Sequence, residues 1–79
     1  MKLTYDPNCN IAYISFRDKP EQVQTIQVSE DLNVDIAPDG TVYGIELLNA
    51  NEQLTADRLG SLVVENQGSG KSEVIKLVV

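Results

Sequence analysis

The chain has 79 residues, of which 42% are hydrophobic and 23% are charged, a composition of ordinary globular proteins rather than of disordered or fibrous ones. A single domain of this size buries only about 60% of the surface that its unfolded chain exposes, so we expect a thin core that partner chains help to stabilise. Twelve acidic residues against six basic residues give a net charge of −6, which disfavours binding to DNA or RNA and favours a basic protein partner.

Several other classes of protein are disfavoured by what the sequence lacks. No apolar run approaches the roughly 18 residues of a membrane-spanning helix, and the N-terminal residues MKLTYDPN lack the apolar segment of a signal peptide. One cysteine, Cys9, and no histidine exclude an internal disulfide and the usual zinc-binding spacings. We therefore expect a cytoplasmic protein that uses no cofactor and binds neither membranes nor nucleic acids.

The first half of the chain alternates short segments rich in β-branched and aromatic residues with turn residues. Asp6–Asn10 has the composition of a turn, and Asp18–Pro20 interrupts the alternation further on. Ala12, Ile14 and Phe16 share one face of their segment, which we expect to be the core face. The strands predicted here are residues 2–5, 11–17, 23–28 and 32–36.

The stretch Ala37-Pro38-Asp39-Gly40 predicts a tight turn between two strands. Proline presets φ at the second position, aspartate suits the third, and Gly40 takes the positive φ that closes a type I turn with a bulge. This explanation accounts for Asp39 without a chemical role. The strand that follows, residues 41–48, is apolar on both faces, so we place it in the centre of the sheet.

The last third of the chain has a different pattern. The spacing of its first apolar residues predicts a helix at about 55–65, with Thr55 as N-cap and Gly60 as a weak point. Residues 67–72 have the composition of a flexible Gly/Ser tether, and the final residues 73–79, EVIKLVV, predict a strand. That strand can pair with its own sheet or with another chain, which leaves self-association through residues 73–79 open.

Together these segments predict an α+β fold. It consists of an antiparallel β-meander of about five short strands packed with one helix, plus a C-terminal strand that pairs in cis or in trans. We expect residues 1–66 to form a single β-rich domain, and residues 67–79 to form the flexible tether and the terminal strand.

The acidic residues near the central turn do not match a metal site. Asp31, Asn33 and Asp35 have the spacing that opens a calcium-binding loop, but Ile36 stands where the loop needs glycine and Val42 where it needs the bidentate glutamate. We interpret the three polar residues as the solvated face of a strand, and we predict no metal ligands.

Two further motifs are also better explained without chemistry. Cys9 lies in a turn and has no histidine to activate it, so we predict no nucleophilic role. The sequence GSGKS at 68–72 matches only the end of a phosphate-binding loop, because Glu65 stands where the first glycine is required. We interpret it as part of the tether.

The remaining polar and aromatic residues define a candidate interaction surface. Three tyrosines on neighbouring segments form either a rim of the core or a contact surface. Acidic residues on adjacent strands add charge to that surface. The candidate residues are Asp31, Asn33, Asp35, Glu46, Tyr5, Tyr13 and Tyr43.

An ordered series of motifs gives the chain a family resemblance. The series is Tyr5-Asp6-Pro7, Ala12–Phe16, Asn33-Val34-Asp35, Asp39-Gly40 and Gly44–Ala50. In this order it resembles the small prokaryotic domain-of-unknown-function family 2283, over about residues 1–54. Two departures stand out: Asn10 occupies a position where members commonly carry an acid, and the tail from about residue 60 lies outside the family pattern.

The resemblance implies a compact β-rich domain, a meander finished by a helix, with no established enzymatic activity and no catalytic residues to carry over. Members are often encoded beside small toxin-like proteins, which implies an antitoxin or other binding role. We predict a non-enzymatic protein-binding module, antitoxin-like or regulatory. The alternatives are a homo-oligomeric structural domain and a small metal-dependent hydrolase that uses Asp35 and Glu46.

Overall fold

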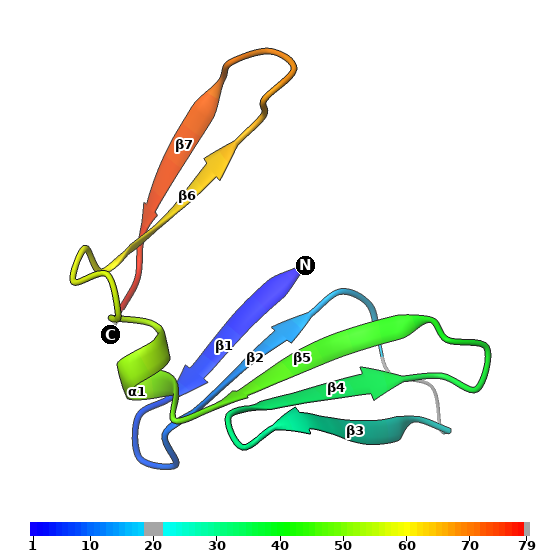
Figure 1. Cartoon of the computed structure of the whole chain (residues 1–79). Coiled ribbons are helices and arrows are strands. Elements are labelled where there is room, and N and C mark those ends of the chain that lie inside the picture. Colours follow the sequence, from blue (N-terminus) through cyan, green and yellow to red (C-terminus); the bar gives the residue numbers. More distant parts are fainter. Residues whose placement is uncertain (19–21, 79) are drawn as a thin grey trace.

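A computed structural model of the chain, which describes residues 1–18 and 22–78, contains two antiparallel sheets and one short helix (Figure 1). The break predicted at Asp18–Pro20 and the end of the predicted terminal strand lie partly outside these residues. The fold is mainly β and broadly α+β. The five strands of the larger sheet are β1 (Lys2–Asp6), β2 (Ile11–Ser15), β3 (Gln24–Ser29), β4 (Leu32–Ile36) and β5 (Val42–Leu48).

The order of these strands is β1-β2-β5-β4-β3, so the prediction of a simple meander is wrong. Strands β3, β4 and β5 do follow one another as a meander, but β5 then pairs with β2 and leaves β3 at an edge. The prediction that residues 41–48 form a central strand is confirmed. The predicted turn before that strand is also present: the Ala37 N–H bonds to the Thr41 carbonyl at 2.9 Å, and Gly40 has φ +89°.

The register of the sheet aligns one aliphatic side chain from every strand. Directly opposite residues of antiparallel strands project from the same face, so these side chains form a continuous row. We call this row the aliphatic rung: Leu3, Ile14, Ile45, Val34 and Ile26. A second row, Tyr5, Ala12, Leu47 and Leu32, lies beside it on the same face. The two rows together are the apolar face of the sheet, and the other side is its polar face.

The helix is much shorter than predicted and lies earlier in the chain. Helix α1 (Ala50–Gln53) directly follows β5, whereas the predicted segment 55–65 is not helical. Arg58 and Gly60 both adopt left-handed φ angles, +61° and +65°, which a right-handed helix cannot contain. Thr55, the predicted N-cap, instead donates its hydroxyl to the Asn51 carbonyl at 2.6 Å.

Residues 61–78 form a hairpin that we call the arm. Its strands are β6 (Ser61–Glu65) and β7 (Ser72–Lys76), and they pair with each other. The loop between them is tied by hydrogen bonds of Asn66 with Lys71 and Gly70, both 2.8 Å, so the predicted Gly/Ser tether is a hairpin turn. The predicted terminal strand therefore pairs in cis, with β6 rather than with the larger sheet.

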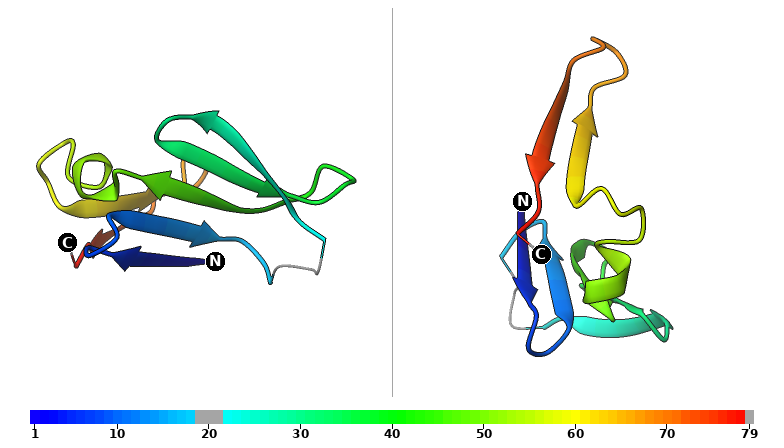
Figure 2. Two further views of the ribbon diagram at one scale, coloured as in Figure 1. Left: turned by 90° about the horizontal axis from the view of Figure 1, so that it is seen from below. Right: turned by 90° about the vertical axis from the view of Figure 1, so that its left-hand side faces the viewer.

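The arm projects away from the sheet, and the chain has little core of its own (Figures 1 and 2). Among the described residues, the buried apolar side chains are only those of Ala12, Ala37 and Ala50. The radius of gyration is 14.1 Å, against about 12 Å for a compact domain of this length. The structure thus exposes apolar surface that a compact monomer would bury.

Asn10 connects the β1–β2 turn to the start of α1. It has a left-handed φ of +59°, its carbonyl accepts the Ala50 N–H at 3.1 Å, and its Oδ1 accepts the Asn51 N–H at 2.6 Å. Asparagine and aspartate tolerate this backbone conformation better than other non-glycine residues. Position 10 of this chain therefore needs a side-chain acceptor.

We expect Asn10→Ala to lower the free energy of unfolding by about 1–3 kcal/mol, because it removes that acceptor and places a Cβ-bearing aliphatic residue at positive φ. Asn10→Asp retains both properties and loses only the 3.3 Å bond that the Asn10 amide donates to Asn49 Oδ1, so as the matched control it should cost about 1 kcal/mol or less. Urea denaturation followed by circular dichroism measures both. Equal losses in the two variants would contradict the role assigned to Asn10.

Candidate functional site

The polar face carries a hydrogen-bonded group centred on Asp35. The Tyr13 hydroxyl donates to Oδ2 of Asp35 at 2.7 Å, and the Thr25 hydroxyl donates to Oδ1 at 2.6 Å. Asp35 is only 7% exposed although it lies on the polar face. Both carboxylate oxygens thus accept hydrogen bonds from neighbouring strands, which links β2, β4 and β3.

Gly44 makes this arrangement possible. It lies on β5 directly between Ser15 of β2 and Asp35 of β4, and the Tyr13 side chain passes over it to reach Asp35. A Cβ atom at position 44 would lie 2.1 Å from the Tyr13 hydroxyl oxygen. Any other residue would displace the tyrosine, so glycine is required here by close approach rather than by its φ angle.

The neighbouring acid, Glu46, is held in a separate pair. Its Oε1 accepts a hydrogen bond from the Asn33 side-chain amide at 2.9 Å. Asp35 and Glu46 project from the same face of adjacent strands, as the hydrolase alternative requires. However, no group of three or more histidine, cysteine, aspartate or glutamate residues in the described parts of the chain could hold a metal ion. The arrangement has the form of a structural network between strands.

The structure brings together four of the seven predicted surface residues, Tyr13, Asn33, Asp35 and Glu46, and separates the other three. Tyr5 lies on the apolar face, and its hydroxyl donates to the Asn51 side chain. Asp31 is exposed in the turn between β3 and β4. Tyr43 lies at a bulge in β5, where the Arg17 guanidinium carbon is 5.6 Å from the centre of its ring.

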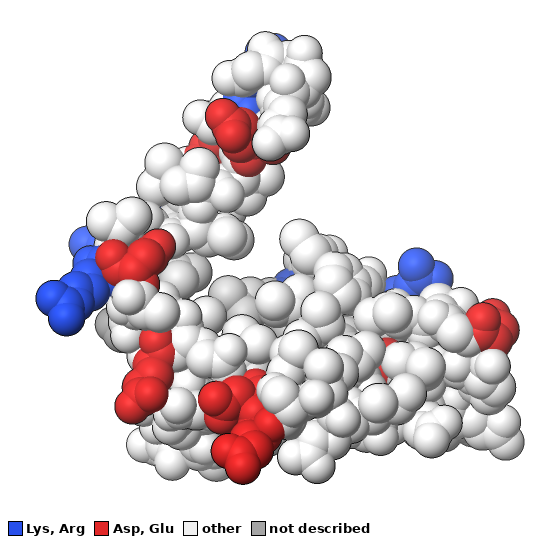
Figure 3. Space-filling model, viewed as in Figure 1, with Lys and Arg blue, Asp and Glu red and all other residues white. Residues whose placement is uncertain are grey.

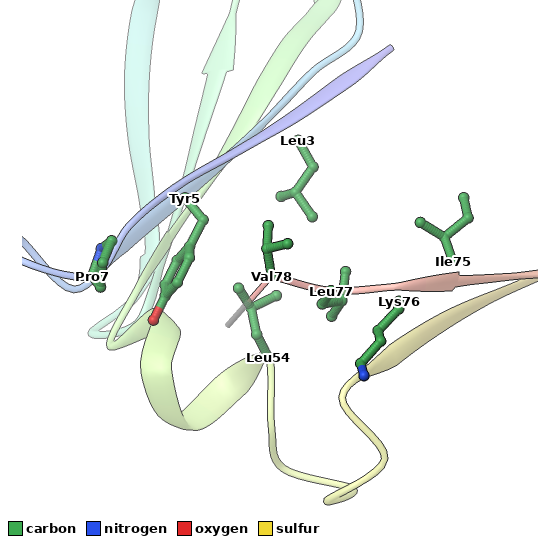
Figure 4. Close-up of a pocket in the computed structure, with 8 residues that line it drawn as sticks. All are labelled: Leu3, Tyr5, Pro7, Leu54, Ile75, Lys76, Leu77 and Val78. Atoms are coloured by element: carbon green, nitrogen blue, oxygen red, sulfur yellow. The ribbon is translucent and has the colours of Figure 1, made fainter.

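The apolar face is hollowed where the base of the arm meets β1. Figure 4 shows Leu3 and Tyr5 of β1 facing Leu54, Leu77 and Val78 from the other side of a pocket. Tyr5 points its hydroxyl toward the helix and its ring toward the pocket. The charged end of the one lysine in the lining points away from these apolar side chains, so the pocket is chiefly aliphatic.

A second hollow, of about 480 Å³, separates the arm from β1 and β2. Figure 3 shows it as an open notch between arm and sheet, with mostly uncharged walls. Its lining is entirely apolar and comes from both sides of the notch: Met1, Leu3, Ile14, Phe16, Leu62, Ile75 and Leu77. The arm therefore touches the sheet only near its base and leaves apolar side chains of both parts uncovered.

Sequence reasoning missed Thr25, Gly44 and the apolar surface of the arm. Thr25 and Gly44 acquire their roles from the strand register, which places them on either side of Asp35. A signal for the arm was present, because residues 61–65 and 72–76 are both rich in β-branched residues and flank a Gly/Ser turn. The spacing of the leucines in this region also fits a helix, and it led to the incorrect prediction of a helix there.

Cys9 lies in the β1–β2 turn, fully exposed, beside Asp6. A side-chain hydrogen bond to Asp6, together with the repulsion between two negative charges, raises the pKa of the Cys9 thiol. The thiol form is favoured and the nucleophilic thiolate is disfavoured.

We expect Gly44→Ala to lower the free energy of unfolding by about 1–3 kcal/mol, because the new methyl group collides with Tyr13 and breaks its bond to Asp35. In a Tyr13→Ala background the same substitution meets no ring and costs much less. A double-mutant cycle measured by urea denaturation separates the cost of the collision with Tyr13 from any other cost of the substitution. The same cost in both backgrounds would show that Tyr13 does not constrain position 44.

For Cys9 we expect slow alkylation by iodoacetamide at neutral pH and a faster reaction in Asp6→Asn. The asparagine still accepts the turn's N–H bonds but carries no charge, so the pKa of the thiol falls and more thiolate is present at a given pH. The rate measured from pH 7 to 10 should have its midpoint at lower pH in the variant. A midpoint that stays in place, or moves up, would contradict the role of Asp6.

Comparison with known proteins identifies the larger sheet as a family domain. The family model "Protein of unknown function (DUF2283)" matches residues 2–51, which include β1 to β5 and the start of α1 but not the arm. No curated protein and no solved structure matches the chain. Among the described residues no helix is long and apolar enough to cross a membrane. More than half of the chain matches, and the chain therefore belongs to the DUF2283 family of proteins of unknown function.

Proposed function

We propose that the chain is a non-enzymatic protein-binding module whose binding surface consists of the apolar face and the arm. One observation carries the proposal: large apolar side chains are exposed on both parts. The arm residues Leu62, Val63, Val64, Val74 and Ile75 are between 45% and 68% exposed. On the larger sheet, Leu3 and Phe16 beside the notch and Ile26 at the opposite edge are between 37% and 42% exposed.

Exposed apolar side chains are ordinary when they are scattered, but contiguous patches of several hundred Å² mark interaction surfaces. Here they are contiguous, because the rung residues stand side by side across the sheet and the notch joins them to the arm. A polypeptide segment or a second protein surface would remove them from water. The hydrophobic effect, at about 25 cal/mol per Å², supplies the binding energy.

The net charge of −6 bears on which partners can approach. Within residues 61–78 two acids, Glu65 and Glu73, balance two bases, Lys71 and Lys76, so the net charge of −6 lies on residues 1–60. A basic partner would associate faster with such a surface than a neutral one. An antitoxin-like or regulatory role is the version of the proposal in which a basic protein occupies the apolar surface. Binding of such a basic protein to this chain should weaken at high salt, which distinguishes this version from binding of a neutral partner.

The proposal is tested with protein biotinylated at the lone exposed Cys9 and incubated with cytoplasmic extract at 0.15 M and 1 M NaCl. We expect a stoichiometric protein, either another polypeptide or unlabelled copies of this chain, to be retained. The variant Val63→Thr/Val74→Thr should bind it at least about tenfold more weakly, because it loses two methyl groups that the complex buries.

The matched control is Val63→Ile/Val74→Ile, which keeps both positions apolar and β-branched and should retain the same protein. Retention that is equal in the threonine variant and the wild type would place binding elsewhere on the chain. If the wild type retained no protein at either salt concentration, the proposed function would be wrong.

A further inference from the structure

We infer that the partner that covers this surface is a second copy of the chain, with the arm of each copy lying against the apolar face of the other. The inference rests on the proposed function, since it takes the same surface and names its occupant. Such a dimer has twofold symmetry, in which the arm-to-face contact occurs twice. Four observations favour a second copy over a foreign protein.

The first observation is the amount of surface left uncovered. A folded monomer of 8.7 kDa has an accessible surface of about 4,700 Å² on average, whereas this chain exposes 6065 Å². The excess is about 1,300 Å² per chain. A standard interface buries about 800 Å² on each partner, and obligate homodimers bury more. The excess surface is therefore large enough for the interface of a stable dimer of this chain.

The second observation is that each face of the arm carries a central pair of apolar residues, which on the outer face is flanked by the pairs Ser61–Lys76 and Glu65–Ser72. Its register places Leu62 opposite Ile75 on one face and Val63 opposite Val74 on the other. The first pair, with Leu77, lines the notch that faces the chain's own sheet. The second pair faces away, with Val63 55% and Val74 68% exposed. The arm's own chain can thus cover only one face, and the other requires a surface from outside.

The third observation is a match of dimensions. Each strand of the arm has five residues, or about 17 Å, which is close to the length of the strands that carry the aliphatic rung. A two-stranded hairpin is about 10 Å wide, whereas five paired strands span about 24 Å. The notch at the base of the chain's own arm is lined by residues of β1 and β2, so the face over β5, β4 and β3 is left for a second arm.

The fourth observation is electrostatic. The arm carries no net charge, and on its outer face the two valines lie between one acid, Glu65, and one base, Lys76. The arm can therefore approach a second acidic copy without the repulsion that two surfaces of like charge would experience. The acidic residues of the sheet stay in solvent, because the rung that the arm would contact contains only leucine, isoleucine and valine.

The first test measures the mass of the full chain by sedimentation equilibrium from 1 to 100 µM. We expect twice the monomer mass of 8.7 kDa for the wild type and for Val63→Ile/Val74→Ile. Val63→Thr/Val74→Thr should need about a hundredfold higher concentration to dimerise. Threonine is β-branched like valine, so the hairpin keeps its strand propensity, and far-ultraviolet circular dichroism confirms that the variant is folded.

The second test needs no variant and reports which surfaces meet. An equal mixture of isotope-labelled and unlabelled wild-type chains is examined by filtered nuclear Overhauser spectroscopy, which detects only contacts between chains. We expect intermolecular contacts from the methyl groups of Val63 and Val74 to those of Ile45, Val34 and Ile26. A dimer that lacks these contacts would overturn the arm-to-face arrangement.

A wild-type chain that remains a monomer at 100 µM would overturn the inference but not the proposed function. The extract experiment then decides between the two. A different protein retained through Val63 and Val74 would leave the binding module intact with a foreign partner. A monomer that also retains no protein would refute both.

Discussion

The structure depends on one row of aliphatic side chains that crosses every strand of the larger sheet. Leu3, Ile14, Ile45, Val34 and Ile26 are aligned by the strand register, and their position on one face means that a single layer must cover them all. A sheet is stable only when its apolar face is buried against another element. Helix α1 has four residues, and the arm reaches the sheet only at its base, so this chain does not provide that layer alone.

The opposite face shows why the apolar face is the one that requires a partner. There the polar groups bond to one another: Asp35 accepts from Tyr13 and Thr25, and Glu46 accepts from Asn33. Among the described residues that are not exposed, no fully buried side-chain nitrogen or oxygen lacks a hydrogen-bond partner. A face of this kind is stable in water, whereas the rung is not. The two faces differ in what they need: the polar network satisfies its own hydrogen bonds, whereas the rung needs the second protein surface that we propose.

Features that depend on local chemistry were predictable from the sequence, whereas features that depend on which strands become neighbours were not. The turn at residues 37–40 was predictable from local chemistry, and the central place of residues 41–48 from the apolar residues on both faces of that strand. The helix predicted at 55–65 failed because the leucine spacing competed with β-branched residues that find partners in 72–76. Strand order and the role of Gly44 depend on which strands become neighbours, which a single sequence does not state.

The family match ends at Asn51, before the arm begins. The matched residues therefore contain the whole aliphatic rung, whose apolar side chains are uncovered. The arm that we propose to cover them lies in the residues that follow the match. In the dimer that we propose, the sheet and the arm are complementary parts of one interface. A foreign partner would have to reproduce the apolar hairpin that each copy already carries.

Whether a second copy covers the arm is measured most directly by amide hydrogen exchange of β6 and β7 as a function of protein concentration. An isolated two-stranded hairpin is marginally stable, so its amides exchange rapidly unless another surface covers it. The proposed dimer predicts slow exchange in the arm at 100 µM and progressively faster exchange on dilution, while β2 and β5 change less. Rapid exchange in the arm at every concentration would contradict it.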